Sequence, residues 1–375
     1  MTDDRIARLT YNLIIFNLVS VDYCFVSVYS AGTFLLIPPP VWVNPQYLRK
    51  IRQAIDVRSI MAKTIIREFI DGKDEGAWIE LYNEFKSYYY SSDFEPLDER
   101  GVEWFKRTPW WRESRLFIAE RDGEPVGFIL PFIDKAYDPP KGYIWEFAVK
   151  PNLEGNEVDS ILLGKAVSWL SSAGARGIQA SARDNMLKRI RLYQSVGFKM
   201  IRTFSRMRLK PEEIRENIGA CAEAELRIAN PTWSYEDLKT LNALCNMAFQ
   251  EHFDFRPETL EETKAWLEEE GYENHVLIAL IRGKPVGYVV ASISDKLSGD
   301  RPKIGFISSI GVLKPFRRRG IGTSLILEAI KWLSRKGAES IELDVDDANP
   351  TGAPLFYAKI GFKATFKTLT YLKRL

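Results

Sequence analysis

The sequence predicts an α/β (α+β) protein that contains two tandem copies of one domain. First, the segment at 116–130 matches the segment at 276–290 at a constant offset of 160 residues. Second, each match is followed by a strand pattern and then by a stretch with apolar residues at i, i+3, i+4 and i+7, which is typical of an amphipathic helix. Third, both copies close on a Gly-Phe pair. An ordered repeat of this kind indicates a duplicated domain.

The elements of the two copies follow the same order. Each matching segment predicts a hairpin, because two apolar runs flank a turn that contains glycine. A strand, a helix, a second strand and a closing helix follow, at 144–151, 159–175, 177–182 and 184–198 in the first copy and at 307–315, 323–338, 340–345 and 348–362 in the second. Each closing segment has an Asn eight residues before a Tyr, as in Asn349 and Tyr357.

The repeat divides the chain into predicted domains. The first copy is expected at 62–210 and the second at 225–375, joined by a charged helical linker at 211–224. Residues 1–61 form an N-terminal extension of uncertain status, since Met61 opens a stretch typical of a cytosolic start. The extension either precedes the true start or is dispensable; a strand-rich appendage and a membrane anchor are the alternatives.

The composition excludes several classes of function. Lys and Arg number 52 against 50 Asp and Glu, so the chain lacks the net charge that draws in nucleic acid or an anionic membrane. The three cysteines, Cys24, Cys221 and Cys245, are far apart and odd in number, which disfavours disulfides and predicts a cytoplasmic location. The only histidines are His252 and His275, so no metal is expected.

One motif, PFRRRGIGTS at 315–324, carries chemistry that the composition does not. Three arginines precede a Gly-Ile-Gly turn that opens a predicted helix. A helix start offers unpaired N–H groups and the positive end of the helix dipole, and Gly320 and Gly322 let a ligand approach the backbone. The motif therefore predicts a site for a phosphate or pyrophosphate. Neither the Walker pattern nor the dinucleotide-binding pattern of glycines fits this turn.

This motif and the segment NPTGAPLFYAKIGF at 349–362 resemble the acetyl-CoA-binding motifs of the GCN5-related N-acetyltransferases (GNAT). The tandem arrangement resembles the mycothiol-synthase-like branch of that family. The resemblance implies two tandem GNAT domains, each a mixed, mostly antiparallel, twisted sheet flanked by helices, with a splayed central strand pair. It also implies acetyl-CoA as the co-substrate.

The resemblance also implies roles for residues of the second copy. Strand residues beside the splay would pair with the pantetheine arm, the phosphate loop would hold the pyrophosphate, and Asn349 would contact the cofactor or fix the diverging strand. Tyr357 would act as general acid toward the leaving thiolate; its alternative role is packing. The cofactor-binding residues are then Ile310, Gly311, Val312, Arg317, Arg318, Arg319, Gly320, Ile321, Gly322, Thr323 and Asn349.

The general base stays open at this point. Many family members place a carboxylate on the strand before the phosphate loop, where this chain has Ser308 and Ser309. His252 is a candidate catalytic base because its unperturbed pKa is about 6.5; packing is the alternative role. Asp344 and Asp346 are further candidates if they face the cleft.

The first copy lacks this motif. Its aligned residues include Glu154, Glu157 and Asp159, and carboxylates at these positions would repel a pyrophosphate. We therefore expect a first domain without cofactor, although Glu146 and Tyr193 persist there. Its segment at 88–111 is expected either to shape the acceptor pocket or to form that domain's own core.

The predicted function is an acetyl-CoA-dependent N-acetyltransferase, active in the C-terminal domain. It would transfer an acetyl group to a primary amine by direct attack in a ternary complex. The acceptor is expected to be a small molecule or a protein amine, with no nucleic acid or membrane partner, and the chain a monomer or homodimer. The alternative is a non-catalytic module that senses acyl-CoA or contacts a protein partner.

Overall fold

The computed structural model describes residues 64–91, 94–215, 219–221, 223–230, 234–294 and 302–375. The chain divides into two compact units, Met1–Ala62 and Lys63–Leu375, and all described residues belong to the second. The predicted extension at 1–61 and Cys24 therefore lie outside the described residues.

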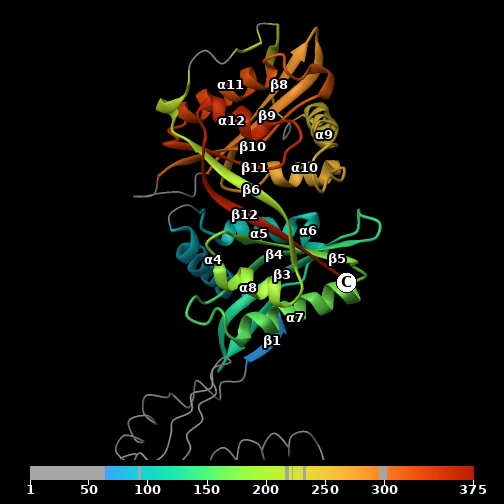
Figure 1. The fold of residues 1–375 in the computed structure, drawn as a ribbon, viewed down its shortest axis with the longest axis vertical. Coiled ribbons are helices and arrows are strands. Elements are labelled where there is room, and N and C mark those ends of the chain that lie inside the picture. Colours follow the sequence, from blue (N-terminus) through green and yellow to red (C-terminus); the bar gives the residue numbers. More distant parts are fainter. Residues whose placement is uncertain (1–63, 92–93, 216–218, 222, 231–233, 295–301) are drawn as a thin grey trace, which may run out of the picture. The chain divides into compact units, whose positions relative to one another are not determined.

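The described strands form one twelve-stranded sheet (Figure 1) with the order β1-β2-β3-β4-β5-β12-β6-β11-β10-β9-β8-β7. Strands of the first half of the chain are β1 (Thr64–Glu68), β2 (Phe117–Arg121), β3 (Glu124–Asp134), β4 (Lys141–Val149), β5 (Gly177–Arg183) and β6 (Lys199–Leu209). Those of the second half are β7 (Glu225–Ala229), β8 (Tyr272–Ile281), β9 (Lys284–Ser294), β10 (Ile304–Val312), β11 (Ser340–Asp346) and β12 (Lys363–Arg374). All pairs are antiparallel except β4 with β5 and β10 with β11, which confirms a mixed, mostly antiparallel sheet.

The helices recur in the same order in both halves. The first half contains α4 (Glu75–Tyr90), α5 (Glu99–Arg107), α6 (Pro109–Arg112), α7 (Glu157–Ser172) and α8 (Leu187–Ser195). The second contains α9 (Tyr235–Phe249), α10 (Leu260–Leu267), α11 (Ile321–Arg335) and α12 (Ala353–Ile360). The helical linker expected at 211–224 is wrong for the described part of that segment, which holds only a 3-10 turn at Pro211–Glu213.

Local sequence explains where several of these helices begin. The Asp98 side chain accepts a hydrogen bond from the Gly101 N–H and caps α5. Thr259 and Glu262 form a reciprocal capping box at the start of α10. These caps satisfy N–H groups that the first turn of a helix leaves unpaired.

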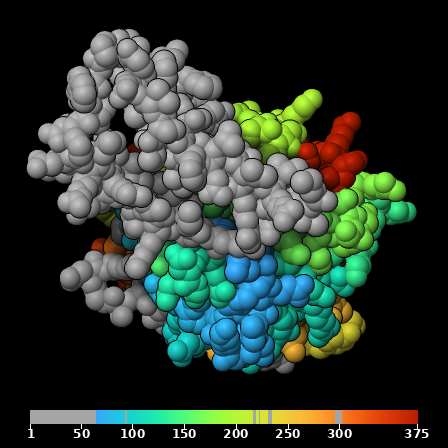
Figure 2. Space-filling model, turned by 90° about the horizontal axis from the view of Figure 1, so that it is seen from below, coloured from blue at the N-terminus to red at the C-terminus, as the bar shows by residue number. Residues whose placement is uncertain are grey.

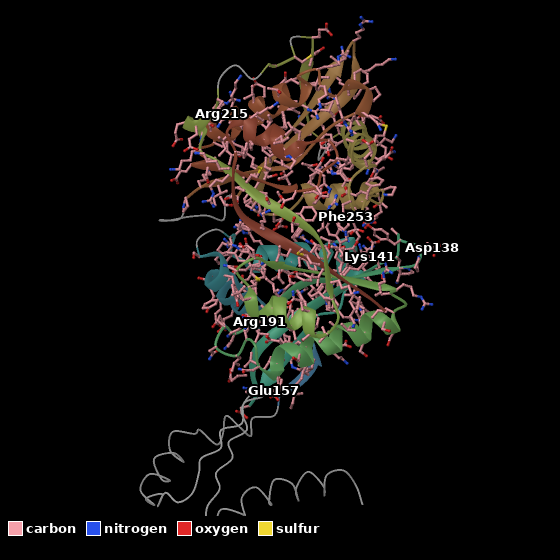
Figure 3. The ribbon with its side chains drawn as sticks, viewed as in Figure 1. Asp138, Lys141, Glu157, Arg191, Arg215 and Phe253 are labelled. Carbon is pink, nitrogen blue, oxygen red and sulfur yellow. The ribbon has the colours of Figure 1, made fainter. Side chains whose placement is uncertain are left out.

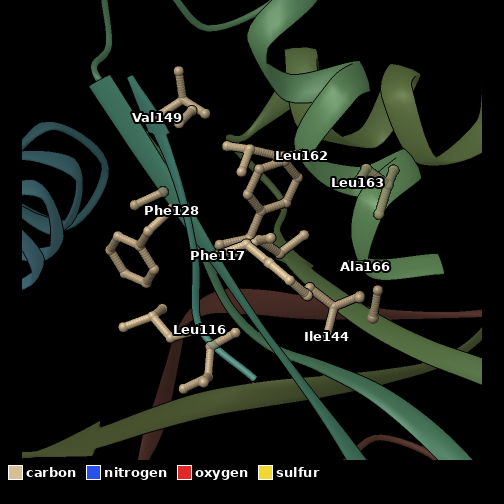
Figure 4. Packing of buried hydrophobic residues seen from close by; sticks show 14 of the residues in the cluster. Leu116, Phe117, Phe128, Ile144, Val149, Leu162, Leu163 and Ala166 are labelled. Carbon is tan, nitrogen blue, oxygen red and sulfur yellow. The ribbon is translucent and has the colours of Figure 1, made fainter. Parts of the chain in front are cut away.

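Helices cover both faces of the sheet, so its strands are apolar on both sides. Figure 4 shows Phe117 of β2 against Leu162 and Ala166 of α7. Phe128 of β3 instead packs edge-on against the Trp78 ring of α4. Segments of the first half, coloured blue to green, form much of the face seen in Figure 2. In the second half, α11 and α9 pack on the sheet with separate hydrophobic clusters.

The central strand pair of each half splays apart, as predicted. The parallel pairing of β4 with β5 ends at Ile144 opposite Ala180, and that of β10 with β11 ends at Phe306 opposite Glu342. Beyond these residues β4 and β10 continue in pairing only with β3 and β9. A register shift between Ile307 and Ser309 accompanies the separation in the second half.

The last strands of the two halves are exchanged across the middle of the sheet. β6, the last strand of the first half, pairs with β11 of the second half. β12, the last strand of the chain, lies between β6 and β5 of the first half. The sheet is therefore continuous through both copies, and their division at 62–210 and 225–375 stays a prediction.

This exchange predicts that residues 225–375 alone do not form a stable, soluble unit. The fragment lacks β6, so β11 loses one partner and β12 loses both, and two bare strand edges promote aggregation. We expect the yield of monomer in size-exclusion chromatography to fall by about tenfold or more relative to residues 63–375. A monomeric 225–375 fragment that unfolds cooperatively in urea would contradict this.

Candidate functional site

The strand edge at 307–312 of β10 is open toward the splay. Ile310, Gly311 and Val312 pair with Val289, Tyr288 and Gly287 of β9. No described strand pairs with their other edge, because β11 has separated from β10 at Phe306. Backbone groups on this edge can therefore pair with an extended ligand as an added strand would.

The predicted phosphate loop connects this strand to α11. Arg318 has a φ of +63°, and Gly320, the N-cap of α11, has a φ of +79°. Left-handed backbone is unfavourable for a residue such as arginine and is often found at functional sites. The first turn of α11 carries no acidic residue, so the positive end of its dipole is not neutralised by its own helix.

The two glycines of the loop have different surroundings. A Cβ on Gly320 would lie 2.6 Å from the Gly219 carbonyl oxygen, so packing against the linker itself requires glycine there. A Cβ on Gly322 would have its nearest neighbours at 3.6 and 3.8 Å, which is ordinary contact. Packing within the protein therefore does not require glycine at 322, which leaves the close approach of a ligand as a reason for it.

The three arginines of the loop have partners within the protein. Arg317 donates to the carbonyl oxygens of Val312 at 2.9 Å and Ala248 at 3.1 Å, and pairs with Glu251 at 2.7 Å. Arg318 donates to the Thr351 carbonyl oxygen. Arg319 pairs with Glu223 at 3.1 Å. Thr323 is buried, and Ile321 lies in the core of the second half.

Tyr357 lies on α12 and is 8% exposed. Burial raises the pKa of its phenol, so the hydroxyl is protonated at pH 7. No described residue forms a hydrogen bond with this hydroxyl. The Asn349 side chain takes part in the turn before α12, where its Oδ1 accepts from the Thr351 N–H at 2.9 Å and from the Thr351 hydroxyl at 2.6 Å.

The corresponding cleft of the first half is filled by side chains of the chain itself. Arg189 of α8 is almost fully buried and donates to the Phe147 carbonyl oxygen at 2.8 Å. Phe147 lies on β4 beyond the point where β5 separates from it. Arg189 therefore binds the edge of β4 that no longer pairs with β5. Its guanidinium also pairs with Glu154 at 3.2 Å.

A side chain of the first half also neutralises the positive N-terminal end of α7. Asp159 is 1% exposed and accepts from the Gly155 N–H at 2.7 Å, with its second oxygen buried without a hydrogen bond. The loop keeps its shape, since Gly155 has a φ of +85° where the second copy has Arg318. Tyr193, the counterpart of Tyr357, donates to the Ser181 carbonyl oxygen over 3.5 Å.

A chamber of about 1020 Å³ lies next to the open strand edge of the second half. Ser308 and Ser309 of β10 line one end of it, and Phe253 and Asp254 from the loop after α9 line another. Residues of the first half, among them Tyr90 within the segment at 88–111, complete the wall. The chamber is therefore built from both copies.

The loop after α9 is fastened to the first half of the chain (Figure 3). The Asp254 carboxylate accepts hydrogen bonds from Tyr143 at 3.1 Å and from Lys141, and Tyr137 donates to its carbonyl oxygen at 2.6 Å. Arg256 pairs with Asp134 of β3 at 2.8 Å. Sequence reasoning missed these anchors, because their partners are more than a hundred residues away.

The segment at 88–111 contributes both to the chamber and to the core of the first half; its role in an acceptor pocket stays a prediction. Tyr90, Phe94 and Glu95 line the chamber, and Trp104 donates to the Ala265 carbonyl oxygen of the second half at 3.0 Å. Phe105 and Trp111 instead stack among the aromatic rings of the first half's core.

The candidate bases occupy different surroundings. His252 lines the chamber, where burial and then the Arg317 charge lower its pKa, so its imidazole is neutral at pH 7. Asp344 also lines the chamber but pairs with Arg206 at 2.7 Å. Asp346 is buried and pairs with Arg202 at 2.7 Å.

In the described part of the chain, the only cysteines are free thiols, Cys221 and Cys245.

The described residues contain neither a metal-binding cluster nor a membrane-spanning helix. Within them, no group of three or more His, Cys, Asp or Glu side chains is placed to hold a metal ion. Their helices include none that is long and apolar enough to cross a membrane.

Comparison with known proteins gives two kinds of match. A family model described as "Acetyltransferase (GNAT) family" matches twice, at 78–198 and at 241–362. A mycothiol acetyltransferase of Thermobispora bispora is 28% identical over 260 residues, which cover 66% of this chain and 80% of that protein. An N-alpha-acetyltransferase of Arabidopsis thaliana is 35% identical over 85 residues, which cover 23% of this chain and 43% of that protein.

Solved structures support the same fold. A tandem GNAT protein from the clavulanic acid biosynthesis pathway superposes with a TM-score of 0.66 at 14% identity, over 83% of this chain and 98% of that one. A GCN5-related N-acetyltransferase from Sphaerobacter thermophilus has a TM-score of 0.58 at 20% identity, over 83% of this chain and 95% of that one. At these identities the likeness concerns the fold alone.

Asp159→Asn is predicted to stabilise the protein at pH 7. Burial raises the pKa of Asp159 from 3.8 to about 6, so the folded state holds its proton more tightly than the unfolded state does. This group's contribution to stability therefore falls as pH rises from about 4 to about 6. We expect a gain of about 1–3 kcal/mol in urea unfolding at pH 7 and a flatter dependence on pH between 4 and 6.

The matched control is Glu157→Gln on the same helix, whose exposed side chain pairs with Arg121. This change should alter stability by no more than about 0.5 kcal/mol. If Asp159→Asn destabilises the protein at pH 7 and leaves its pH dependence unchanged, the carboxylate is a stabilising part of the loop rather than a substitute for a ligand.

Proposed function

The chain belongs to the acetyltransferase (GNAT) family as a tandem member of the mycothiol-synthase-like branch, and from this premise we propose that its second copy carries the active site. The chain is an N-acyltransferase. In the proposed reaction an acetyl group passes from acetyl-CoA to a primary amine by direct attack in a ternary complex. The observation that carries the proposal is an open strand edge leading into an unneutralised helix start, present in the second copy and filled in the first.

The residues of the second copy fit acetyl-CoA. The edge at Ile310–Val312 offers backbone groups to a pantetheine arm, apart from the Val312 carbonyl oxygen, which accepts from Arg317. The start of α11 offers N–H groups and the positive end of its dipole to a pyrophosphate. A Cβ built on Gly322 would have its nearest neighbour at 3.6 Å, so there is space beside this residue for a phosphate group. Arg318 and Arg319, both exposed, add positive charge around this position.

The chemistry asks three things of the protein: a donor for the thioester oxygen, a proton for the departing sulfur and a base for the ammonium group of the acceptor. His252 lines the chamber with an imidazole that is neutral at pH 7, so it can accept the ammonium proton directly or through water before the amine attacks. Acetyl-CoA, when bound, supplies a thioester that is open to attack by an amine. Backbone N–H groups on the open edge near Val312 can donate to the thioester oxygen as negative charge develops there. Tyr357 can give its proton to the departing sulfur, because its phenol is protonated at pH 7 and has no partner among the described residues.

The first copy is proposed to bind no acetyl-CoA. Arg189 takes the edge that a pantetheine arm would need, and Asp159 takes a loop N–H that a phosphate would need. Two carboxylates at that helix start, Glu154 and Asp159, would also repel a pyrophosphate. This copy therefore contributes walls and anchors to the site of the second.

Gly322→Asp is predicted to abolish binding of acetyl-CoA by copying the residue that the first copy has there. Wild type should bind one acetyl-CoA per chain in titration calorimetry, and the variant should bind at least about 100-fold more weakly because a carboxylate would occupy the phosphate position. The fold should persist, since an acidic residue suits the first turn of a helix.

Gly164→Asp on α7 is the control, because Gly164 is exposed and a Cβ there would meet no atom within 4 Å. It should leave binding unchanged. A stoichiometry near two would disprove the proposal for the first copy, and full affinity in Gly322→Asp would disprove the assignment of the loop.

Tyr357→Phe is predicted to lower kcat by about 10²–10⁴-fold, the range for loss of a general acid. The affinity for acetyl-CoA and the melting temperature should stay close to wild type, because the substitution breaks no hydrogen bond with a described residue. The measurement is thiol release under saturating acetyl-CoA. An unchanged kcat in Tyr357→Phe would mean that the tyrosine only packs. A wild-type chain that binds acetyl-CoA without turnover would favour the sensing alternative.

A further inference from the structure

The chamber beside the open edge of β10 has aromatic walls. Rings of the first half, such as Tyr82, Tyr90 and Tyr137, face rings of the second half, such as Phe253 and Trp266, across about 1020 Å³. Pockets for small organic ligands have volumes of roughly 300–1,000 Å³ and are lined mainly by apolar and aromatic side chains. This chamber has the size and lining of such a pocket.

The charges around the chamber are unbalanced. Its carboxylates are Glu95, Asp134, Asp254, Glu258, Glu269 and Asp344. Its cations are Lys86, Arg206 and Arg256. The lining is therefore negative overall, since His252 is neutral at pH 7. A negative, aromatic chamber attracts organic cations and disfavours anionic ligands.

Most of these charges are already compensated within the protein. Asp134 pairs with Arg256, Asp344 pairs with Arg206, and Asp254 pairs with Lys141. These pairs fix the wall of the chamber and leave little charge for a ligand.

Glu258 differs from these carboxylates. Its Oε2 accepts hydrogen bonds from the Trp266 indole N–H and the Thr263 hydroxyl, both at 3.3 Å, but no described cation pairs with it. Its backbone is fixed by Asn246, which donates to the Glu258 carbonyl oxygen and accepts from its N–H. Glu258 is therefore a rigidly held, half-buried negative charge that neutral donors orient.

Glu258 shares the chamber with residues of the open strand and of its neighbour β9. Ser308 and Ser309 of β10 and Tyr288 of β9 line the same chamber. The Tyr288 hydroxyl shares a hydrogen bond of 2.7 Å with Ser309, three residues before Val312 on β10. A charge held at Glu258 therefore lies in the same chamber as the strand where transfer is proposed.

We propose that this chamber binds the acceptor as an organic ammonium ion, with its charged nitrogen at Glu258 and an apolar or aromatic body against the surrounding rings. The proposal rests on the proposed function and names its substrate class: a primary amine on an arylalkyl or similar body. The carboxylate attracts the ammonium group, and the ring faces add attraction for the same cation. Acceptors whose bodies are anionic or strongly polar gain neither interaction.

The test uses the full chain with 2-phenylethylamine as the probe and a polar amine, glucosamine, as the comparison. Under saturating acetyl-CoA, thiol release should give a kcat/KM at least about tenfold higher for 2-phenylethylamine. Glu258→Gln should raise KM for 2-phenylethylamine by about 10–100-fold, because a charge-assisted hydrogen bond is lost. The affinity for acetyl-CoA should not change.

Glu261→Gln is the matched control, because Glu261 lies three residues further along the chain, in the first turn of α10, and pairs with Arg112 at the surface. It should leave both KM and acetyl-CoA affinity at wild-type values. Titration of 2-phenylethylamine into the chain without acetyl-CoA gives a second readout, which Glu258→Gln should weaken and Glu261→Gln should not.

The outcomes separate this proposal from the proposed function. Absence of acetyl-CoA binding would disprove the function, whereas tight acetyl-CoA binding with equal KM in wild type and Glu258→Gln would overturn only the role of Glu258. A preference for glucosamine, or for the amine of a peptide, over 2-phenylethylamine would overturn the substrate class.

Discussion

The exchange of β6 and β12 is the constraint on which the rest of this structure depends. Each strand leaves its own copy and completes the sheet of the other, so a ladder of backbone hydrogen bonds joins the copies. Surface ion pairs alone would hold two such domains weakly. The continuous ladder instead fixes their distance, and that distance sets the width of the chamber between them. Its walls can therefore be assembled from residues far apart in the chain.

The two copies differ in what lies at the positive N-terminal end of the helix that follows the splayed strand. The second copy keeps an open strand edge and a positive helix start beside Gly322, while the first inserts Arg189, Glu154 and Asp159. A helix N-terminus needs a negative partner, and Asp159 provides it from within the chain. Its buried carboxylate is costly, as the raised pKa indicates. The first copy therefore has a left-handed residue in the loop, as the second does, with side chains of the chain itself at the helix start.

The features predictable from sequence were local or repeated. The order of elements and the turn before α11 follow from periodicity, from glycine positions and from a motif within one stretch of the chain, whereas the splayed strand pair was expected from the resemblance to the GNAT family. The strand exchange was not predictable, because it depends on pairing between strands of different copies that lie far apart in the chain. The role of Glu258 was hidden for a related reason. Glu258 has no cationic partner in the described part of the chain because the nearby cations pair with other carboxylates. Arg256 of the second copy pairs with Asp134 of the first, and Lys141 of the first copy pairs with Asp254 of the second.

The loop at 250–258 explains why a copy without an open cofactor cleft still matters to the site. Asp254 has a φ of +60°, a conformation that costs an L-residue about 1–2 kcal/mol. Bonds from Tyr137, Lys141 and Tyr143 of the first half offset this cost. Arg256 then bridges Asp134 to Glu262 at the start of α10, which holds the stretch between them, including Glu258, in place. The first copy thereby orients a charge in the chamber where we propose that the acceptor binds, so separation of the two copies would leave that loop without the contacts that set its strained backbone.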